Sequence, residues 1–192
     1  MPAGFVLYGG TAVALRLGHR ASVDFDFFTS DRLDHQALGR IPFISSGQVL
    51  QEQPDALTVS VQRGGPVKLS FFGPIGFGRL GQPETADTTI AVASLLDLGA
   101  TKTKVLLQRV EAKDYLDIAA ILRAGVSLAN ILRGARTLYG DSFNPLVAKK
   151  TLGYFEGGDL ASLDEPTREL LSRASLEDVE LPPVPKLSDR LD

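Results

Sequence analysis

The first half of the chain alternates between short apolar runs and glycine-rich breaks, the pattern of strands joined by tight turns. Residues 5–8 form an apolar run that stops at Gly9-Gly10. Residues 11–17 are rich in alanine and leucine and predict a helix that ends at Gly18. Residues 23–28 read Val-Asp-Phe-Asp-Phe-Phe, and this alternation of polar and apolar side chains predicts a strand.

Elements of the same kind continue to residue 81. Ser30 has the character of a helix N-cap, which predicts a helix over residues 31–39. Residues 73–81 hold four glycines and a proline and predict a loop. Between them, strands are predicted over residues 49–52, 57–62 and 67–72, the last two forming a hairpin around a Gly-Gly turn.

From Ile90 onward the apolar period lengthens to that of helices. The proline-rich tail from Leu181 is predicted to be extended and poorly ordered. The expected fold class is α+β, a small mixed β-sheet with helices followed by a C-terminal helical bundle. The predicted helices cover residues 91–107, 113–123, 128–139 and 143–155. The predicted domains are 1–88 for the α/β part, 89–180 for the helical part and 181–192 for an extended tail.

Composition narrows the class of protein. The chain has 192 residues, of which 44% are hydrophobic and 22% charged, a balance typical of a globular domain. It has no cysteine, which excludes disulfides and thiolate metal sites and fits a reducing compartment. The sequence has no run of about 18 apolar residues and no secretory leader, so we expect a cytoplasmic protein with no membrane partner.

The net charge of −3 conceals an uneven distribution. Residues 1–98 carry 7 basic and 9 acidic side chains, residues 99–150 carry 9 and 4, and residues 151–192 carry 4 and 10. The basic middle segment could meet phosphates, although solvated helix faces would give the same surplus.

Two carboxylates in the strand at 23–28 carry the clearest chemical signal. Successive strand side chains point to opposite faces, so Asp24 and Asp26 share one face. Val23, Phe25 and Phe27 are then expected to point into the core. Carboxylates about 7 Å apart along a strand can converge on hard cations such as Mg²⁺. One cation would bind triphosphate oxygens and a second would activate an attacking hydroxyl, as in two-metal displacement at phosphorus.

The Gly9-Gly10 turn adds a second signal. Glycines let a backbone approach phosphate closely, and the following helix N-terminus offers free amides to an anion. Thr11 would add a hydroxyl donor. Taken singly, a Gly-Gly turn is more often a plain connection, and paired aspartates are as often a solvated strand face. Their combination in a strand–turn–helix–strand context favours a functional site.

The combination resembles the signature of the DNA-polymerase-β-like nucleotidyltransferases, in which Asp-x-Asp follows a Gly-Gly or Gly-Ser turn. The longer string over residues 8–28 resembles the AbiEii/AbiGii toxin family. The resemblance resumes at residues 97–102 and ends with Arg109 and residues 113–117. It implies a nucleotidyltransferase-like fold, Mg²⁺ as cofactor, transfer from a nucleoside triphosphate to an acceptor such as tRNA, and a cognate antitoxin.

The same resemblance implies roles for individual residues. Asp24 and Asp26 would hold the metal, while Gly9, Gly10 and Thr11 would cradle phosphates. Lys102 and Asp117 correspond to motif positions that the family needs for activity.

Spacing adds further basic candidates for the triphosphate. Lys102 and Arg109 are seven residues apart and would share a helix face. Lys113 and Asp117 are four apart, a spacing that by itself favours a plain ion pair over a functional role. We expect these three basic residues to line the wall opposite Asp24 and Asp26. Arg20 could also touch phosphate, whereas the neighbouring His19 is more often a structural histidine.

Two departures from the family pattern keep other interpretations open. Ser70 stands where a third carboxylate is common, and only eight residues precede Gly9, where family members usually have a helix. The alternatives are a small-molecule nucleotidyltransferase of the antibiotic-modifying type and a catalytically inactive nucleotide-binding homologue.

Overall fold

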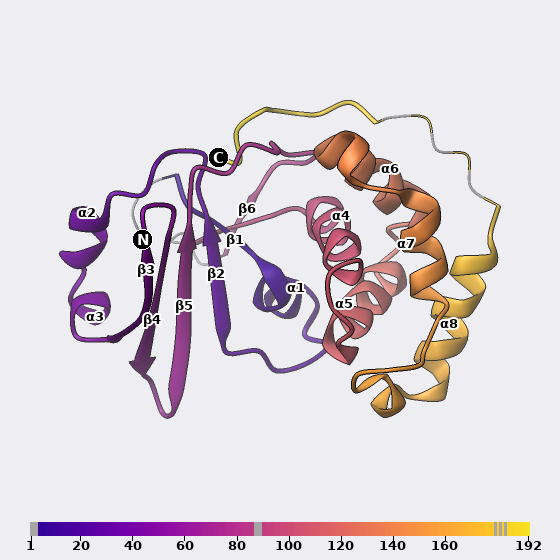
Figure 1. Ribbon diagram of the computed structural model, residues 1–192, viewed down its shortest axis with the longest axis horizontal. Helices are drawn as coiled ribbons and strands as arrows, with labels where there is room; N and C mark the ends of the chain where they lie inside the picture. The colour runs from indigo at the N-terminus through magenta and orange to yellow at the C-terminus, as the bar shows by residue number, and fades with distance from the viewer. Residues whose placement is uncertain (1–3, 87–89, 179, 181, 183) are drawn as a thin grey trace.

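The computed structural model describes residues 4–86, 90–178, 180, 182 and 184–192. Within them, a seven-stranded mixed sheet runs in the order β3-β4-β5-β2-β1-β7-β6 (Figure 1). The strands are β1 Val6–Tyr8, β2 Asp24–Phe28, β3 Gln48–Gln53, β4 Ala56–Gln62, β5 Pro66–Phe72, β6 Glu84–Ala86 and β7 Ile90–Val92. The helices are α1 Gly9–Leu17, α2 His35–Gly39, α3 Pro42–Ser45, α4 Leu95–Leu106, α5 Ala112–Arg123, α6 Leu128–Tyr139, α7 Pro145–Leu152 and α8 Glu165–Leu176.

The centre of the sheet joins strands that are distant in sequence. Strand β2 pairs antiparallel with β1 and parallel with β5. This register places Asp24 beside Lys68 and Asp26 beside Ser70 on β5. On the β1 side, Asp26 is opposite Tyr8. The predicted pair of aspartates therefore lies in the middle of the sheet, not on an edge strand.

The turn from β1 into α1 uses no linking residue. Strand β1 ends at Tyr8 and α1 begins at Gly9, whose φ of +74° lies in the left-handed region that favours glycine. Helix α1 ends as predicted at Gly18, whose backbone N–H donates to the carbonyl of Ala14. This short unit brings the helix N-terminus directly beside β2.

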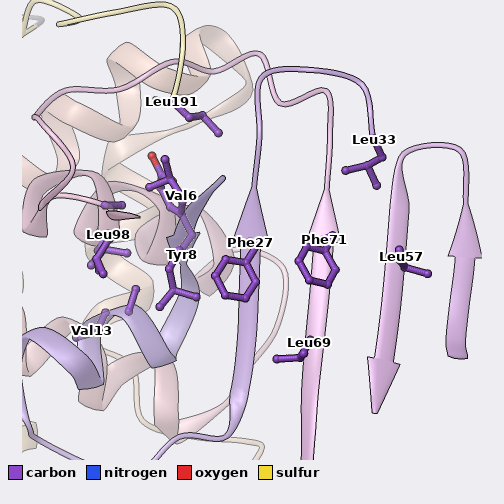
Figure 2. Close-up of a cluster of buried hydrophobic side chains, with 14 of the residues drawn as sticks. Val6, Tyr8, Val13, Phe27, Leu33, Leu57, Leu69, Phe71, Leu98 and Leu191 are labelled. Carbon is purple, nitrogen blue, oxygen red and sulfur yellow. The ribbon is translucent and has the colours of Figure 1, made fainter. Parts of the chain in front are cut away.

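Two apolar clusters hold the molecule together. The first fills the sheet and α1, and it also takes in Leu98, Ile121 and Ile131 from the helical part (Figure 2). The second lies among α4 to α8, around Tyr115 and Phe143. Helix α1 packs against both α4 and α5, and Figure 1 shows it between the sheet and the helical part. The helical part thus contributes side chains to the first cluster as well as forming the second.

The expected mixed sheet followed by a helical bundle is confirmed, with several corrections to individual elements. The helix predicted from residue 31 begins at His35 and is capped by Asp34, not by Ser30. The stretch predicted as one helix over 91–107 is β7 followed by α4, which Ser94 caps. Val23, expected in the core, is 57% exposed. Helices α3 and α8 and strand β6 were not predicted.

The boundary predicted between residues 88 and 89 lies outside the described residues. Strand β7 lies on its C-terminal side yet belongs to the sheet, where it pairs parallel with β1. Among the described residues, none of the helices is by itself both long and apolar enough to cross a bilayer.

The end of the tail is packed, contrary to the expectation of poor order. Leu181 and Pro183, where that prediction began, lie outside the described residues. Leu191 is fully buried in the first cluster, where Figure 2 shows it. Its N–H donates to the Ser30 hydroxyl at 2.9 Å, and the guanidinium of Arg190 donates two hydrogen bonds to Asp31. The C-terminus is therefore attached to the sheet.

Candidate active site

Asp24 and Asp26 open onto one cavity of about 340 Å³, which Gly10 also lines. A Cβ atom added to Gly9 would lie only 2.5 Å from Oδ2 of Asp26. The carboxylate therefore sits directly against the Gly9-Gly10 turn, and any side chain at position 9 would collide with it. We call this cavity the charged compartment.

Basic side chains surround the two aspartates in the charged compartment. Sheet strand β5 contributes Lys68, whose Nζ lies 3.4 Å from Oδ2 of Asp24. The loop after α1 and the α4–α5 region contribute the rest, which are Arg20, Lys102, Arg109 and Lys113. Lys102, Arg109 and Lys113 thus share a cavity with Asp24 and Asp26. A concave, cation-lined surface of this kind attracts a polyanion.

A buried ion-pair network fixes the cationic wall. Asp114, fully buried on α5, accepts hydrogen bonds from Nζ of Lys102 at 2.7 Å and from Nε of Arg109 at 2.8 Å. Asp117, one helical turn further and also fully buried, lies 2.5 Å from the same Lys102 nitrogen. Lys102 therefore bridges the two α5 carboxylates instead of extending freely toward the cavity.

Asp117 also ties the helical part to the loop after α1. It accepts two hydrogen bonds from Arg20, at 2.7 and 3.0 Å, and lies 2.8 Å from Nε2 of His19. The predicted i,i+4 pair between Lys113 and Asp117 does not form, because Lys113 pairs with Glu111 at 2.8 Å. His19 is thus a structural partner of Asp117, in line with the sequence expectation.

The carboxylates of the site fall into two electrostatic groups. Burial raises the pKa of Asp26, and Lys68 lowers it only in part, while the neighbouring Asp24 raises it further. Burial would also raise the pKa values of Asp114 and Asp117, but hydrogen bonds and charges from their basic partners outweigh it and hold both pKa values low. The α5 pair is compensated by the protein, whereas Asp26 is not.

The structure corrects the roles expected for Thr11 and Gly10. Thr11 is 2% exposed, and its hydroxyl bonds Ser22 at 2.7 Å and the backbone carbonyl of Asp24, so it braces β2 instead of facing a phosphate. An added Cβ on Gly10 would lie 2.1 Å from a guanidinium nitrogen of Arg20. Gly10 therefore makes room for Arg20, in addition to lining the cavity.

Arg109 does not share a helix face with Lys102. Helix α4 ends at Leu106, and Arg109 reaches the site from the loop beyond it. The two side chains are brought together by Asp114, which accepts from both.

A second cavity of about 370 Å³ adjoins the first and shares four lining residues with it. The shared residues are Gly10, Asp26, Lys102 and Arg109. We call it the aromatic compartment, because rings from β1, β2 and the end of α6 line it, namely Tyr8, Phe28 and Tyr139. The two compartments therefore form one cleft with walls of different character.

The donor set fits a magnesium ion supplied with substrate. Ser70, in the expected third-carboxylate position, is 3% exposed and lies 3.4 Å from the Thr58 hydroxyl. Within the described ranges, no group of three or more histidine, aspartate or glutamate side chains is placed to hold a metal ion. Mg²⁺ usually binds through one or two carboxylates plus substrate phosphates, and Asp24 and Asp26 match that requirement.

Lys68 and Asp114 were not singled out from the sequence. Lys68 reaches the site because β5 pairs in parallel with β2, a contact between strands about forty residues apart that no local pattern announces. In the sequence, Asp114 stands out only as a neighbour of Lys113.

The strand–turn–helix–strand unit, with paired aspartates facing a cationic cleft, defines a nucleotidyltransferase. The chain belongs to the AbiEii family, whose model is described as nucleotidyl transferase AbiEii toxin, type IV toxin–antitoxin system, and matches residues 2–189. Membership implies a nucleoside triphosphate substrate and an antitoxin partner.

Three further proteins are similar to this chain in sequence or in fold. The uncharacterized protein aq_aa25 of Aquifex aeolicus is 33% identical over 158 residues, covering 79% of this chain and 74% of that protein. The crystal structure of JHP933 from Helicobacter pylori is similar with a TM-score of 0.56 at 18% identity, covering 90% of this chain and 82% of that one. MenT4, a nucleotidyltransferase toxin from Mycobacterium tuberculosis, is similar with a TM-score of 0.61 at 13% identity, covering 90% and 74%.

Proposed function

We propose that this nucleotidyltransferase uses Mg²⁺ to transfer a nucleoside monophosphate from a nucleoside triphosphate to a hydroxyl group of an RNA acceptor, tRNA being the class we favour. The observation that carries the proposal is the charged compartment, where Asp24 and Asp26 face five basic side chains beside the Gly9-Gly10 turn. Oxygen donors of this kind suit a hard cation, and the basic side chains suit a triphosphate.

Each group has a distinct task in this proposal. Asp24 and Asp26 hold the metal, which when bound polarises phosphate oxygens and offsets their charge. Lys102 and Arg109, fixed by Asp114, face the triphosphate from the helical part. Lys113 and Arg20 add charge from either side. Asp117 acts through Lys102 and Arg20, so it is a positioning residue.

The transfer is a substitution at the α-phosphorus. The acceptor hydroxyl oxygen forms a bond to the α-phosphorus. The bond from the α-phosphorus to the oxygen that bridges the α- and β-phosphates breaks, and pyrophosphate leaves with that oxygen. The hydroxyl proton passes to water. Fixed cations near the departing pyrophosphate stabilise the charge that develops on it, and because they are already in place they need no reorganisation.

An RNA acceptor is favoured by the charge of the middle segment. Residues 99–150 carry 9 basic and 4 acidic side chains, while the flanking segments are acidic on balance. This segment forms most of α4, all of α5 and α6, and most of α7, and residues of α4, α5 and α6 line the cleft. A small acceptor would not need that surplus, whereas an RNA brings phosphates to meet it.

The test is incubation of the protein with α-labelled nucleoside triphosphates and Mg²⁺, together with either total tRNA or small hydroxylated acceptors. We expect label to enter the tRNA and pyrophosphate to appear in equal amount. We also expect labelling to fall steeply with added salt, because counterion release drives RNA binding. Label on small acceptors alone, insensitive to salt, would contradict the RNA assignment and support an antibiotic-modifying type of enzyme.

A further inference from the structure

The aromatic compartment has the lining of a site for a flat ring. The rings of Tyr8 and Phe28 stack with centroids 5.0 Å apart and planes at 14°. Tyr139 is held by Phe77, whose ring centroid lies 5.5 Å away. Rings that are fixed by other rings lose little freedom when a ligand packs on them. Tyr8 is only 1% exposed, so the partly exposed rings of Phe28 and Tyr139 are the ones on which a nucleobase could stack. Such rings accept any nucleobase, because every base has a π-face.

Three further lining side chains come from one stripe of α4 and the turn that follows it, and Lys104 of α4 also lines the compartment, with Nζ 5.5 Å from the centroid of the Tyr139 ring. Thr101, Val105 and Gln108 follow the spacing of a single helix face, and all three line the compartment. Gln108 lies just beyond α4, where its N–H donates to the carbonyl of Val105 and so continues the helical turn. The stripe therefore places a glutamine amide at the mouth of an aromatic pocket.

The Gln108 amide is available to a ligand. The residue is exposed, and among residues 4–86, 90–178, 180, 182 and 184–192 no hydrogen bond engages its side chain. A primary amide offers donors and an acceptor side by side. That combination is the one with which glutamine reads the edge of a base.

The position of this compartment relative to the charged one supplies the last step. Lys102 and Arg109 stand between them, lining both. A molecule with a polyanion at one end and a flat heterocycle at the other would span the cleft. A volume of about 370 Å³ falls within the range of small-ligand sites.

Resting on the proposed function, we infer that the aromatic compartment receives the nucleobase of the bound nucleoside triphosphate, and that Gln108 reads its edge. The same chemistry could serve the terminal base of an acceptor RNA. The shared Lys102 and Arg109 favour the triphosphate, because its base is tied to phosphates that these two cations bind.

The direct test is equilibrium binding of the four nucleoside triphosphates, as non-transferable α,β-methylene analogues with Mg²⁺, to the wild type and to Gln108→Glu. This substitution preserves size but replaces the amide donors with acceptor-only oxygens. Adenine and cytosine present an amino donor where guanine and uracil present a carbonyl acceptor. The affinity ratio of the first pair to the second should therefore rise at least about fivefold, the low end of what a base-edge contact discriminates.

Two controls keep the result specific. Gln51→Glu makes the same change on the exposed strand β3, outside both compartments, and should leave the ratio unchanged. Inorganic tripolyphosphate, which has no base, is the second control. Its affinity for Gln108→Glu relative to the wild type should equal its affinity for Gln51→Glu relative to the wild type.

The outcomes separate this inference from the function on which it rests. If neither tripolyphosphate nor any analogue binds the wild type, the proposed function and this inference both fail. If they bind but Gln108→Glu leaves the base ratio unchanged, only the inference is overturned. It is equally overturned if Gln108→Glu changes the KM for acceptor RNA and leaves the base ratio of the triphosphates unchanged.

Discussion

At the scale of single residues, the site contrasts carboxylates that the protein neutralises with carboxylates that it leaves open. Asp114 and Asp117 are fully buried, and each pairs with Lys102 and with an arginine. Asp24 is half-exposed, and among the residues that the structure describes its one basic partner is Lys68, whose Nζ lies 3.4 Å away. We therefore expect the first pair to support the fold and Asp24 and Asp26 to support the chemistry.

Asp117→Asn tests the structural side of this contrast. The substitution leaves Lys102 and Arg20 without their shared carboxylate in a buried setting, so we expect a loss of about 3–5 kcal/mol in unfolding free energy. Asp24→Asn is the matched control, because its pairing with Lys68 is solvent-exposed and should contribute within about 1 kcal/mol. Urea unfolding without divalent ions measures both. Equal losses in the two variants would show that the network around Asp117 carries no special share of stability.

Lys102 illustrates what a sequence motif leaves out. The family motif and the spacing predict a side chain that contacts the triphosphate. Because Lys102 bridges two buried carboxylates, its truncation would remove one cation from each, leaving Asp114 with Arg109 and Asp117 with Arg20, and we expect it to lower stability as well. A loss of activity in Lys102→Ala would therefore not by itself show that Lys102 contacts the substrate.

At the scale of elements, the sequence predicted the features that depend only on residues close together in the chain. Alternation in β2 placed Asp24 and Asp26 on one face, and Gly18 ends α1 as expected, although α1 begins at Gly9 and not at Thr11. Strands β6 and β7 have three residues each, too few to show a period, and β7 exists because it pairs with the distant β1. The sequence does contain a start signal for helix α8. Asp164 is its N-cap, and Pro166 follows in the first turn.

The C-terminal segment is the element least expected from the sequence, and its contribution can be measured. Leu191→Ala removes a fully buried side chain from the first apolar cluster, which should cost about 2–5 kcal/mol of unfolding free energy. Leu187→Ala makes the same change four residues earlier, where the side chain is 51% exposed, and should cost much less. Thermal or urea unfolding of the two variants decides the matter. Equal stability of both would mean that the tail is not docked on the sheet in solution.

At the scale of the whole molecule, the buried ion-pair network links the sheet to the helical part. It should also determine how the unfolding free energy depends on pH in acid. The folded pKa values of Asp114 and Asp117 lie below the ordinary value of about 3.9. The folded state therefore binds fewer protons than the unfolded state near that pH. The stability they contribute is fully present above the unfolded pKa and is lost as the pH falls through the folded values.

We accordingly predict that unfolding free energy falls as the pH drops below about 4. Asp117→Asn should show a weaker fall, since it removes one of the groups responsible. Asp178→Asn, at an exposed position after α8, should follow the wild type. Urea unfolding at a series of pH values measures all three, and an unchanged slope in Asp117→Asn would contradict the assignment.

The central claim is that Asp24 and Asp26 make the cleft a metal-dependent site for nucleotidyl transfer. The most direct measurement is pyrophosphate release from nucleoside triphosphates with total tRNA and Mg²⁺, comparing the wild type with Asp26→Asn at matched folded fraction. Because Asp26 is partly buried without full compensation, Asp26→Asn should keep or slightly raise the unfolding midpoint measured without divalent ions. We predict that the wild type releases pyrophosphate in step with RNA labelling and that Asp26→Asn, fully folded, releases none. A folded Asp26→Asn protein with wild-type release would contradict the account.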